Sequence, residues 1–241
     1  MKISEYIANK IDRLPKGYVF TYEDFIDEVD GKEAVIKALN RMAETGKISK
    51  LSKGKYYKPE KTTFGELAPP QYQVVKDLLE DNGKVIGYLT GLSVYSQLGL
   101  TTQVGNQIQI GKNEVRPSFK RERYIIAFIR QRNTITRENI PLLQLLDALR
   151  YIKKIPDTTP VEAVKRLQAL INELSSEEEK TIVRLSQKYP PSTRALLGAI
   201  LEQLTRQDYT DTIKKTLNPI TKYKLKSIAS VLSAAENWNI V

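Results

Sequence analysis

The 241-residue sequence contains neither cysteine nor histidine. The absence of cysteine excludes disulfides, thiolate metal sites and thiol nucleophiles. The absence of histidine removes the usual general base near neutral pH and the commonest ligand of transition metals. Hydrolysis by Ser-His-Asp or Cys-His groups, HExxH zinc chemistry and zinc fingers are therefore excluded. An enzyme with this composition would be restricted to carboxylate and Mg²⁺ chemistry, or to lysine.

Long hydrophobic runs are also absent. The longest candidate, Tyr124 to Ile129, is bounded by arginine on both sides and is typical of a buried strand, too short to span a membrane. The first residues, Met1 to Tyr6, lack the apolar region of a secretory signal, so nothing in them predicts export. With 41% hydrophobic and 27% charged residues, the composition is that of an ordinary soluble globular protein.

The chain is strongly basic, because 38 Lys and Arg residues against 28 Asp and Glu residues give a formal net charge of +10. This balance favours a polyanionic partner, although the distribution of the charge is more informative than its sum.

The first 60 residues have the pattern of a small DNA-binding domain. Apolar spacing predicts helices over residues 4–14 and 32–45, and a second helix that begins after Thr21 as its N-cap. Residues 18–20 form a short β-prone run, and residues 48–58 alternate around a Lys-Gly turn as a hairpin. This order of elements is that of a winged helix-turn-helix over residues 1–60.

The charge in this segment is strongly polarised. Residues 46–61 carry six lysines against Glu60, whereas residues 22–30 carry five acids and no base. On the third helix Lys37 and Arg41 lie one turn apart with Asn40 beside them, opposite the apolar stripe. Arg and Asn have the shapes that read guanine and adenine edges, and lysines in a hairpin would bind phosphates. Two alternatives stay open: the lysines protect an exposed sheet edge, or the domain binds protein.

The remainder of the chain predicts a second domain. Residues 61–70 are polar and rich in proline, which indicates a linker. Residues 71–241 are predicted as a mixed α/β segment followed by a helical bundle, with strands near 107–110 and 124–129 and a last helix near 223–238. Caps at Thr159, Ser176 and Ser192 mark three helix starts. The expected fold class is mainly α with some β (α+β).

A second basic cluster spans residues 112–137, and its candidate surface comprises Arg116, Lys120, Arg121 and Arg123. The arginines there can equally be rim residues that hold a buried strand in register. The rival function is therefore an RNA- or protein-interaction module that uses residues 112–137, with the winged helix as a scaffold.

Catalytic signals are weak. Asp157 followed by Glu178 and Lys180 matches a loose carboxylate-nuclease pattern, but Glu178 and Lys180 fall in the first turn of a predicted helix, which does not suit a Mg²⁺ site. No GxGxxG or GxxxxGK[ST] spacing occurs. We therefore expect no enzyme, no catalytic residue, no metal and no cofactor.

Five short stretches resemble a known family. Residues 17–25 (GYVFTYEDF), 34–42 (AVIKALNRM), and the pieces 46–48 (GKI) and 54–59 (GKYYKP) are similar to the winged-helix start of the AbiEi-type antitoxins. These proteins are the regulators of type IV toxin-antitoxin (abortive infection) systems. Residues 98–104 (LGLTTQV) resemble a later segment of the same group, although Gly105 stands where proline is expected. The resemblance covers residues 5–130.

This resemblance implies a cytoplasmic bacterial protein that binds and represses the promoter of its own operon. It also implies that the C-terminal domain counters a nucleotidyltransferase toxin, with or without direct contact. The sequence does not predict the oligomeric state. The resemblance matches Lys32, Lys37, Asn40 and Arg41 to the DNA-facing helix and residues 50–58 to the wing. We also expect the N-terminus of the second helix, near Thr21, to hold a phosphate. The candidate DNA-binding residues are therefore Thr21, Lys32, Lys37, Asn40, Arg41, Lys50, Lys53, Lys55 and Lys58.

Overall fold

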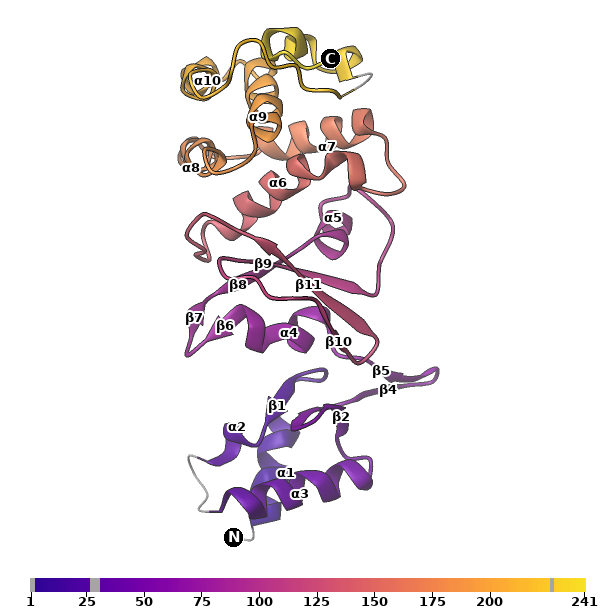
Figure 1. The fold of residues 1–241 in the computed structure, drawn as a ribbon. Coiled ribbons are helices and arrows are strands. Elements are labelled where there is room, and N and C mark those ends of the chain that lie inside the picture. Colours follow the sequence, from indigo (N-terminus) through magenta and orange to yellow (C-terminus); the bar gives the residue numbers. More distant parts are fainter. Residues whose placement is uncertain (1–2, 27–30, 226–227) are drawn as a thin grey trace. The chain divides into compact units, whose positions relative to one another are not determined.

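The computed structural model describes residues 3–26, 31–225 and 228–241, which form two compact units (Figure 1). The first unit comprises Met1–Leu78 with Lys120–Arg123, and the second comprises Leu79–Phe119 with Tyr124–Val241. Helices and several small sheets occur together, so the expected mixed α+β class is confirmed. No helix within the described residues is long and apolar enough to cross a bilayer.

The first unit begins with alternating helices and strands. Its elements are α1 (Ile3–Arg13), β1 (Val19–Thr21), α2 (Glu23–Ile26), α3 (Lys32–Glu44), β2 (Ser49–Ser52) and β3 (Lys55–Tyr57). The three strands form an antiparallel sheet in the order β1-β3-β2. The helices and the hairpin lie where the sequence predicts them, but residues 27–30, the predicted end of the second helix, lie outside the described part.

The core of the first unit is small and aromatic. Ile7 and Ile11 of α1 pack with Val35 and Leu39 of α3, and all four are fully buried. Phe20, Phe25 and Tyr56 complete the cluster, with Phe20 and Phe25 meeting edge to face at 5.6 Å between ring centroids. Gly46 follows α3 with φ +70°, the left-handed conformation expected after a helix end.

Residues 61–70, expected as a linker, carry a short hairpin of β4 (Glu60–Thr62) and β5 (Gly65–Leu67). The next helix, α4 (Gln71–Leu79), belongs to the first unit as far as Leu78. The side chain of Gln73 accepts a hydrogen bond from the Val19 amide at 3.1 Å, which ties α4 to β1. The first unit therefore extends beyond residue 60.

The second unit is built on a four-stranded sheet. Its first elements are β6 (Glu80–Asp81), β7 (Lys84–Val85), β8 (Gly87–Thr90), α5 (Leu92–Gln97), β9 (Gln107–Lys112), β10 (Phe119–Arg121) and β11 (Tyr124–Arg130). The sheet order is β10-β11-β9-β8, where β8 and β9 are antiparallel and β9 and β11 are parallel. β6 and β7 form a separate short hairpin.

The chain continues from this sheet into a series of helices, of which the first lies next to the strands (Figure 1). They are α6 (Ile140–Arg150), the 3₁₀ turn η1 (Ile152–Lys154), α7 (Pro160–Asn172), α8 (Ser176–Ser186), α9 (Pro191–Gln203) and α10 (Gln207–Lys214). Thr159 and Glu162 form a capping box at α7, as expected. The cap of α8 is Ser175 rather than Ser176, and α9 starts after Pro190 without a side-chain cap, so Ser192 is not its cap.

The predicted last helix near 223–238 is wrong. The chain instead forms two 3₁₀ segments, η2 (Ile228–Ser230) and η3 (Ser233–Trp238). The Tyr223 amide donates to the carbonyl oxygen of Asn239, and the two ends of the segment pair as a bridge between Tyr223 and Ile240. Trp238 lies so close to Gly198 of α9 that a side chain at residue 198 would collide with its ring. Side-chain packing therefore overrides the helical pattern.

A buried carboxylate joins the sheet of the second unit to its helices. Asp147 of α6 is fully buried and accepts hydrogen bonds from the hydroxyls of Tyr88 (2.7 Å), Thr90 (3.0 Å) and Tyr189 (2.9 Å). Burial raises the pKa of Asp147 to about 6, although the three hydroxyl donors favour its charged form.

This pKa shift predicts a pH-dependent stability. Asp147 binds its proton more tightly in the folded state than in the unfolded chain, where its pKa is near 3.8. Protonation of Asp147 therefore stabilises the folded state at low pH, and this stabilisation is lost as pH rises through 6. Relative to Asp147→Asn, which stays neutral, we expect the wild type to lose about 3 kcal/mol of unfolding free energy between about pH 3.5 and 6.5. Urea unfolding of both proteins across this pH range measures the two free energies of unfolding. A difference between them that does not change with pH would contradict the raised pKa of Asp147.

Candidate nucleic-acid interface

The outer face of α3 presents two cations. Lys37 and Arg41 are exposed one turn apart, while Val35, Leu39 and Met42 on the opposite face are buried. Lys37 and Arg41 also line an open groove of about 400 Å³ whose other side includes Ile3 and Ser4 of α1. Neither side chain forms an ion pair or hydrogen bond with residues 3–26, 31–225 or 228–241. Both charges are therefore available to an outside partner.

Asn40, the third predicted reader on α3, has an internal partner. Its side-chain oxygen accepts a hydrogen bond from the Tyr56 hydroxyl at 2.6 Å. Reading an adenine edge uses both the oxygen and the amide of asparagine, and the oxygen is occupied here. Asn40 therefore connects α3 to β3 in this structure.

The lysines of the hairpin divide into two groups. Lys50 and Lys53 are exposed, and neither has a side-chain partner in the described part of the chain. Lys55 forms an ion pair with Asp77 of α4 at 2.5 Å. The ammonium of Lys58 donates to the carbonyl oxygens of Asp12 (2.7 Å) and Leu14 (2.8 Å), which satisfies groups that the end of α1 leaves free.

Asp77 is held by more than one cation. Arg121 contacts both carboxylate oxygens at 2.7 and 3.1 Å and also donates to the carbonyl oxygen of Val74. Burial disfavours the charged form of Asp77, but the hydrogen bonds from Arg121 and Lys55 outweigh it and hold the pKa of the carboxyl below its usual range. Lys55 and Arg121, both predicted to contact nucleic acid, are therefore each bonded to Asp77 within the first unit.

The predicted phosphate site at the start of α2 is occupied by a carboxylate. The Thr21 amide and hydroxyl both donate to Asp24, and the Glu23 amide donates to the Thr21 hydroxyl. A phosphate at this position would meet two acidic side chains. Lys32, at the start of α3, lies 4.6 Å above the Tyr22 ring, so its charge already has a favourable neighbour.

The residues of the second predicted surface are divided between the two units. Arg116 belongs to the second unit, where its guanidinium lies over the rings of Phe119 (4.6 Å) and Phe128 (5.3 Å). Lys120, Arg121 and Arg123 are grouped with the first unit, where Lys120 and Arg123 are exposed and the Arg121 side chain is only 11% exposed.

The loose nuclease pattern has a structural explanation. Glu178 accepts hydrogen bonds from the amide and hydroxyl of Ser175 as part of the capping box of α8, and Lys180 pairs with Glu177. Glu178 lies in the first turn of α8, as the sequence predicts, and Lys180 is the fifth residue of this helix. Within the described residues no group of three or more acidic side chains could hold a metal ion.

Comparison with known families places the chain. A family model matches residues 6–182, which is more than half of the sequence and includes parts of both units. The chain belongs to DUF6088, a family of unknown function. No curated protein matches this DUF6088 chain.

The fold of this DUF6088 protein is shared with a solved structure. It is similar to the crystal structure of the RV2827C protein from Mycobacterium tuberculosis, with a TM-score of 0.58 and 14% sequence identity. The alignment covers 93% of this chain and 85% of the other. The similarity therefore extends over both units, and at this identity it describes the fold alone.

The division of the hairpin lysines can be tested through stability. We expect Lys58→Met to lower the free energy of unfolding by about 1 kcal/mol, because two carbonyl oxygens at the end of α1 lose a charged donor. The matched variant Lys50→Met removes the same charge from an exposed side chain and should change stability by less than about 0.5 kcal/mol. Urea unfolding compares them, and equal effects would refute the division.

Proposed function

We propose that the first unit binds duplex DNA, with α3 in the major groove and the β2–β3 hairpin along the phosphate backbone. The order α1-β1-α2-α3-β2-β3, with strands in the order β1-β3-β2, supports this because it is the arrangement of a winged helix-turn-helix. The observation that carries the proposal is the set of exposed cations without internal partners in the described chain: Lys37, Arg41, Lys50 and Lys53.

The proposed contacts are of two kinds, those that recognise bases and those that bind phosphates. Arg41 has the fork that matches a guanine edge, and it is placed on the exposed face of α3. Lys50 and Lys53 supply charge to phosphates without selecting a sequence. Asn40, Lys55 and Lys58 support this surface from within, because each is bonded to another part of the first unit.

We further propose that the protein is a cytoplasmic transcriptional repressor of its own operon and the antitoxin of a type IV system that counters a nucleotidyltransferase toxin. This part rests on the resemblance of residues 17–59 and 98–104 to AbiEi-type antitoxins. The rival module at residues 112–137 has less support, since Arg121 is committed to Asp77 and Arg116 lies over two phenylalanine rings.

DNA binding is tested by electrophoretic shifts of the full chain with its operon promoter and a scrambled duplex of equal length. Arg41→Ala should reduce the preference for the promoter, because a good base contact is worth roughly 1–3 kcal/mol of discrimination. Lys53→Ala should weaken both duplexes equally and reduce the salt slope by about 0.9.

The control for both variants is Lys165→Ala, which removes one exposed charge from α7 in the second unit. It should leave both affinities near those of the wild type. Equal losses on the two duplexes for Arg41→Ala would remove its reading role, and no shift with any duplex would overturn the proposal.

The antitoxin role is tested separately by co-expression with the nucleotidyltransferase encoded beside the gene. Induction of that neighbour alone should stop growth, and co-expression of this chain should restore it. Restoration by the Arg41→Ala variant as well would place the neutralising function outside the DNA surface. Failure of the wild-type chain to restore growth would refute the antitoxin role without bearing on DNA binding.

A further inference from the structure

The second unit contains a strongly basic cavity that none of the functions above uses. It has a volume of about 400 Å³ and lies where the end of β11, the end of α6 and the connection from α8 to α9 meet. None of the described residues that line it is acidic. Its cationic lining residues are Arg130, Arg132, Arg150, Lys188 and Arg194.

Five like charges around one cavity repel each other. Arg150 favours the charged form of the buried Asp147 and lies 5.1 Å from the Tyr151 ring centroid, but none of the five forms an ion pair within the described residues. The carboxylate behind the wall, Asp147, has its oxygens occupied by three hydroxyl donors. The ammonium of Lys188 donates to the backbone oxygen of Arg132, so this contact brings two of the cations together without a neutralising charge. An anion in the cavity would attract each of these cations and so offset their mutual repulsion.

One donor in the cavity wall is both buried and unused. The Nε of Arg194 is inaccessible to solvent and has no acceptor among the described residues. An unpaired buried donor costs about 1–3 kcal/mol, more when it is charged, so the Arg194 side chain gains from turning this donor toward a ligand oxygen. Guanidinium groups bind phosphate oxygens through paired N–H donors.

The polar residues at the base of the cavity are already satisfied. Gln131 donates to the hydroxyls of Tyr88 and Tyr189, and its side-chain oxygen accepts from Asn133. The Tyr189 hydroxyl in turn donates to Asp147. These groups form a fixed wall, so the cations are the recognition elements.

Helix α9 adds positive potential at the same place. Pro190 and Pro191 line the cavity at the start of this 13-residue helix, which no side chain caps. The positive end of the helix dipole therefore faces the region where the cations gather, an arrangement that favours phosphate.

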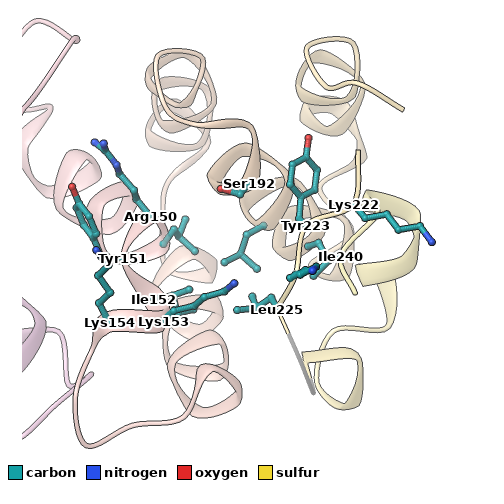
Figure 2. A pocket seen from close by; sticks show the side chains of 13 residues that line it. Arg150, Tyr151, Ile152, Lys153, Lys154, Ser192, Lys222, Tyr223, Leu225 and Ile240 are labelled. Atoms are coloured by element: carbon teal, nitrogen blue, oxygen red, sulfur yellow. The ribbon is translucent and has the colours of Figure 1, made fainter. Parts of the chain in front are cut away.

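A neighbouring cavity of about 340 Å³ shares Arg150 with the first (Figure 2). Part of its wall is apolar, formed by Leu149, Leu196 and Leu225, and part is cationic, formed by Arg150, Lys153, Lys154, Lys222 and Lys224. Figure 2 shows Lys153 extending toward the centre of this cavity, whereas Lys222 extends away. Apolar side chains beside cations suit a ligand that has an organic part as well as negative charge.

We propose that the basic cavity binds two or more linked phosphate groups of a small molecule. Inorganic triphosphate and a nucleoside triphosphate share this chemistry. The apolar wall of the neighbouring cavity favours the nucleotide, whose phosphates would lie among the five cations of the basic cavity while its base and sugar contact the leucines of the second cavity. The site belongs to the second unit and does not depend on DNA binding by the first.

The test is isothermal titration of the full-length protein with ATP, GTP, CTP and UTP and, separately, with inorganic triphosphate. We expect saturable binding of one ligand per chain. Arg194→Gln should weaken it by about tenfold or more, because it removes a charged donor from the cavity wall. The double variant Arg130→Gln/Arg132→Gln alters two exposed side chains, preserves the interior, and should weaken binding at least as much.

Lys165→Gln is the matched control, since it removes one exposed positive charge from α7, away from both sets of lining residues. An unchanged affinity in this variant supports a specific site, and a loss equal to that of Arg194→Gln would show attraction to net charge only and overturn the proposal. Circular dichroism confirms that Arg194→Gln is folded, and Arg194→Lys, which keeps the charge, should bind with intermediate affinity.

The ligand panel separates the two sources of phosphate. Tighter binding of a nucleoside triphosphate than of inorganic triphosphate supports the role of the apolar cavity, and equal affinity supports recognition of the phosphate chain alone. If no nucleoside triphosphate and no inorganic triphosphate binds, the proposal is refuted. Binding of an RNA oligonucleotide would not rescue it, because the proposed ligand is a small molecule. Promoter binding by Arg194→Gln should stay at the wild-type level, which distinguishes failure here from failure of DNA recognition.

Discussion

The buried charge of Asp147 is the constraint around which the second unit is organised. A carboxylate without access to water must be hydrogen-bonded, and its three hydroxyl donors come from β8 and from the connection between α8 and α9. The hydroxyl of Tyr189 also accepts from Gln131, which follows β11, so the end of that strand and the start of α9 are fixed relative to α6. The basic cavity lies at this junction. Its cations are therefore carried by segments whose positions follow from satisfying one buried acid.

The first unit uses its cations in a related way. Asp77 fixes Lys55 and Arg121, and the carbonyl oxygens at the end of α1 fix Lys58, so these side chains order the hairpin and α4 within the unit. Lys50 and Lys53 lie on the same hairpin, are exposed, and have no such partner among the described residues, so their charges are not neutralised within this part of the chain. Because Lys55 and Lys58 already hold the backbone of the hairpin, binding of an anion by Lys50 and Lys53 would order fewer groups. The entropy lost on binding is therefore smaller than for a flexible hairpin.

Local patterns predicted most of the elements. Apolar periodicity and cap chemistry predict α1 and α3, the β2–β3 hairpin, strands near residues 107 and 124, and the capped start of α7. The segment near 223–238 failed because its backbone pairs across a loop and its tryptophan packs on Gly198, which are long-range interactions. The exposed cations of α3 were predictable from helical spacing. The internal partners of Asn40, Lys55 and Lys58 were not, since each lies on another element.

The same limit explains why the basic cavity has no signal in the sequence. Arg130 and Arg132 belong to a basic cluster visible along the chain, but Arg150, Lys188 and Arg194 lie about 20, 58 and 64 residues after Arg130 and are not part of that cluster. Only the fold brings the five together, and it does so beside a carboxylate that is already saturated. A net charge of +10 can arise from charges spread to keep a surface soluble or from charges gathered to meet an anion. Convergence on a cavity with an unpaired guanidinium donor is the second case, because solubility requires neither a cavity nor a buried donor.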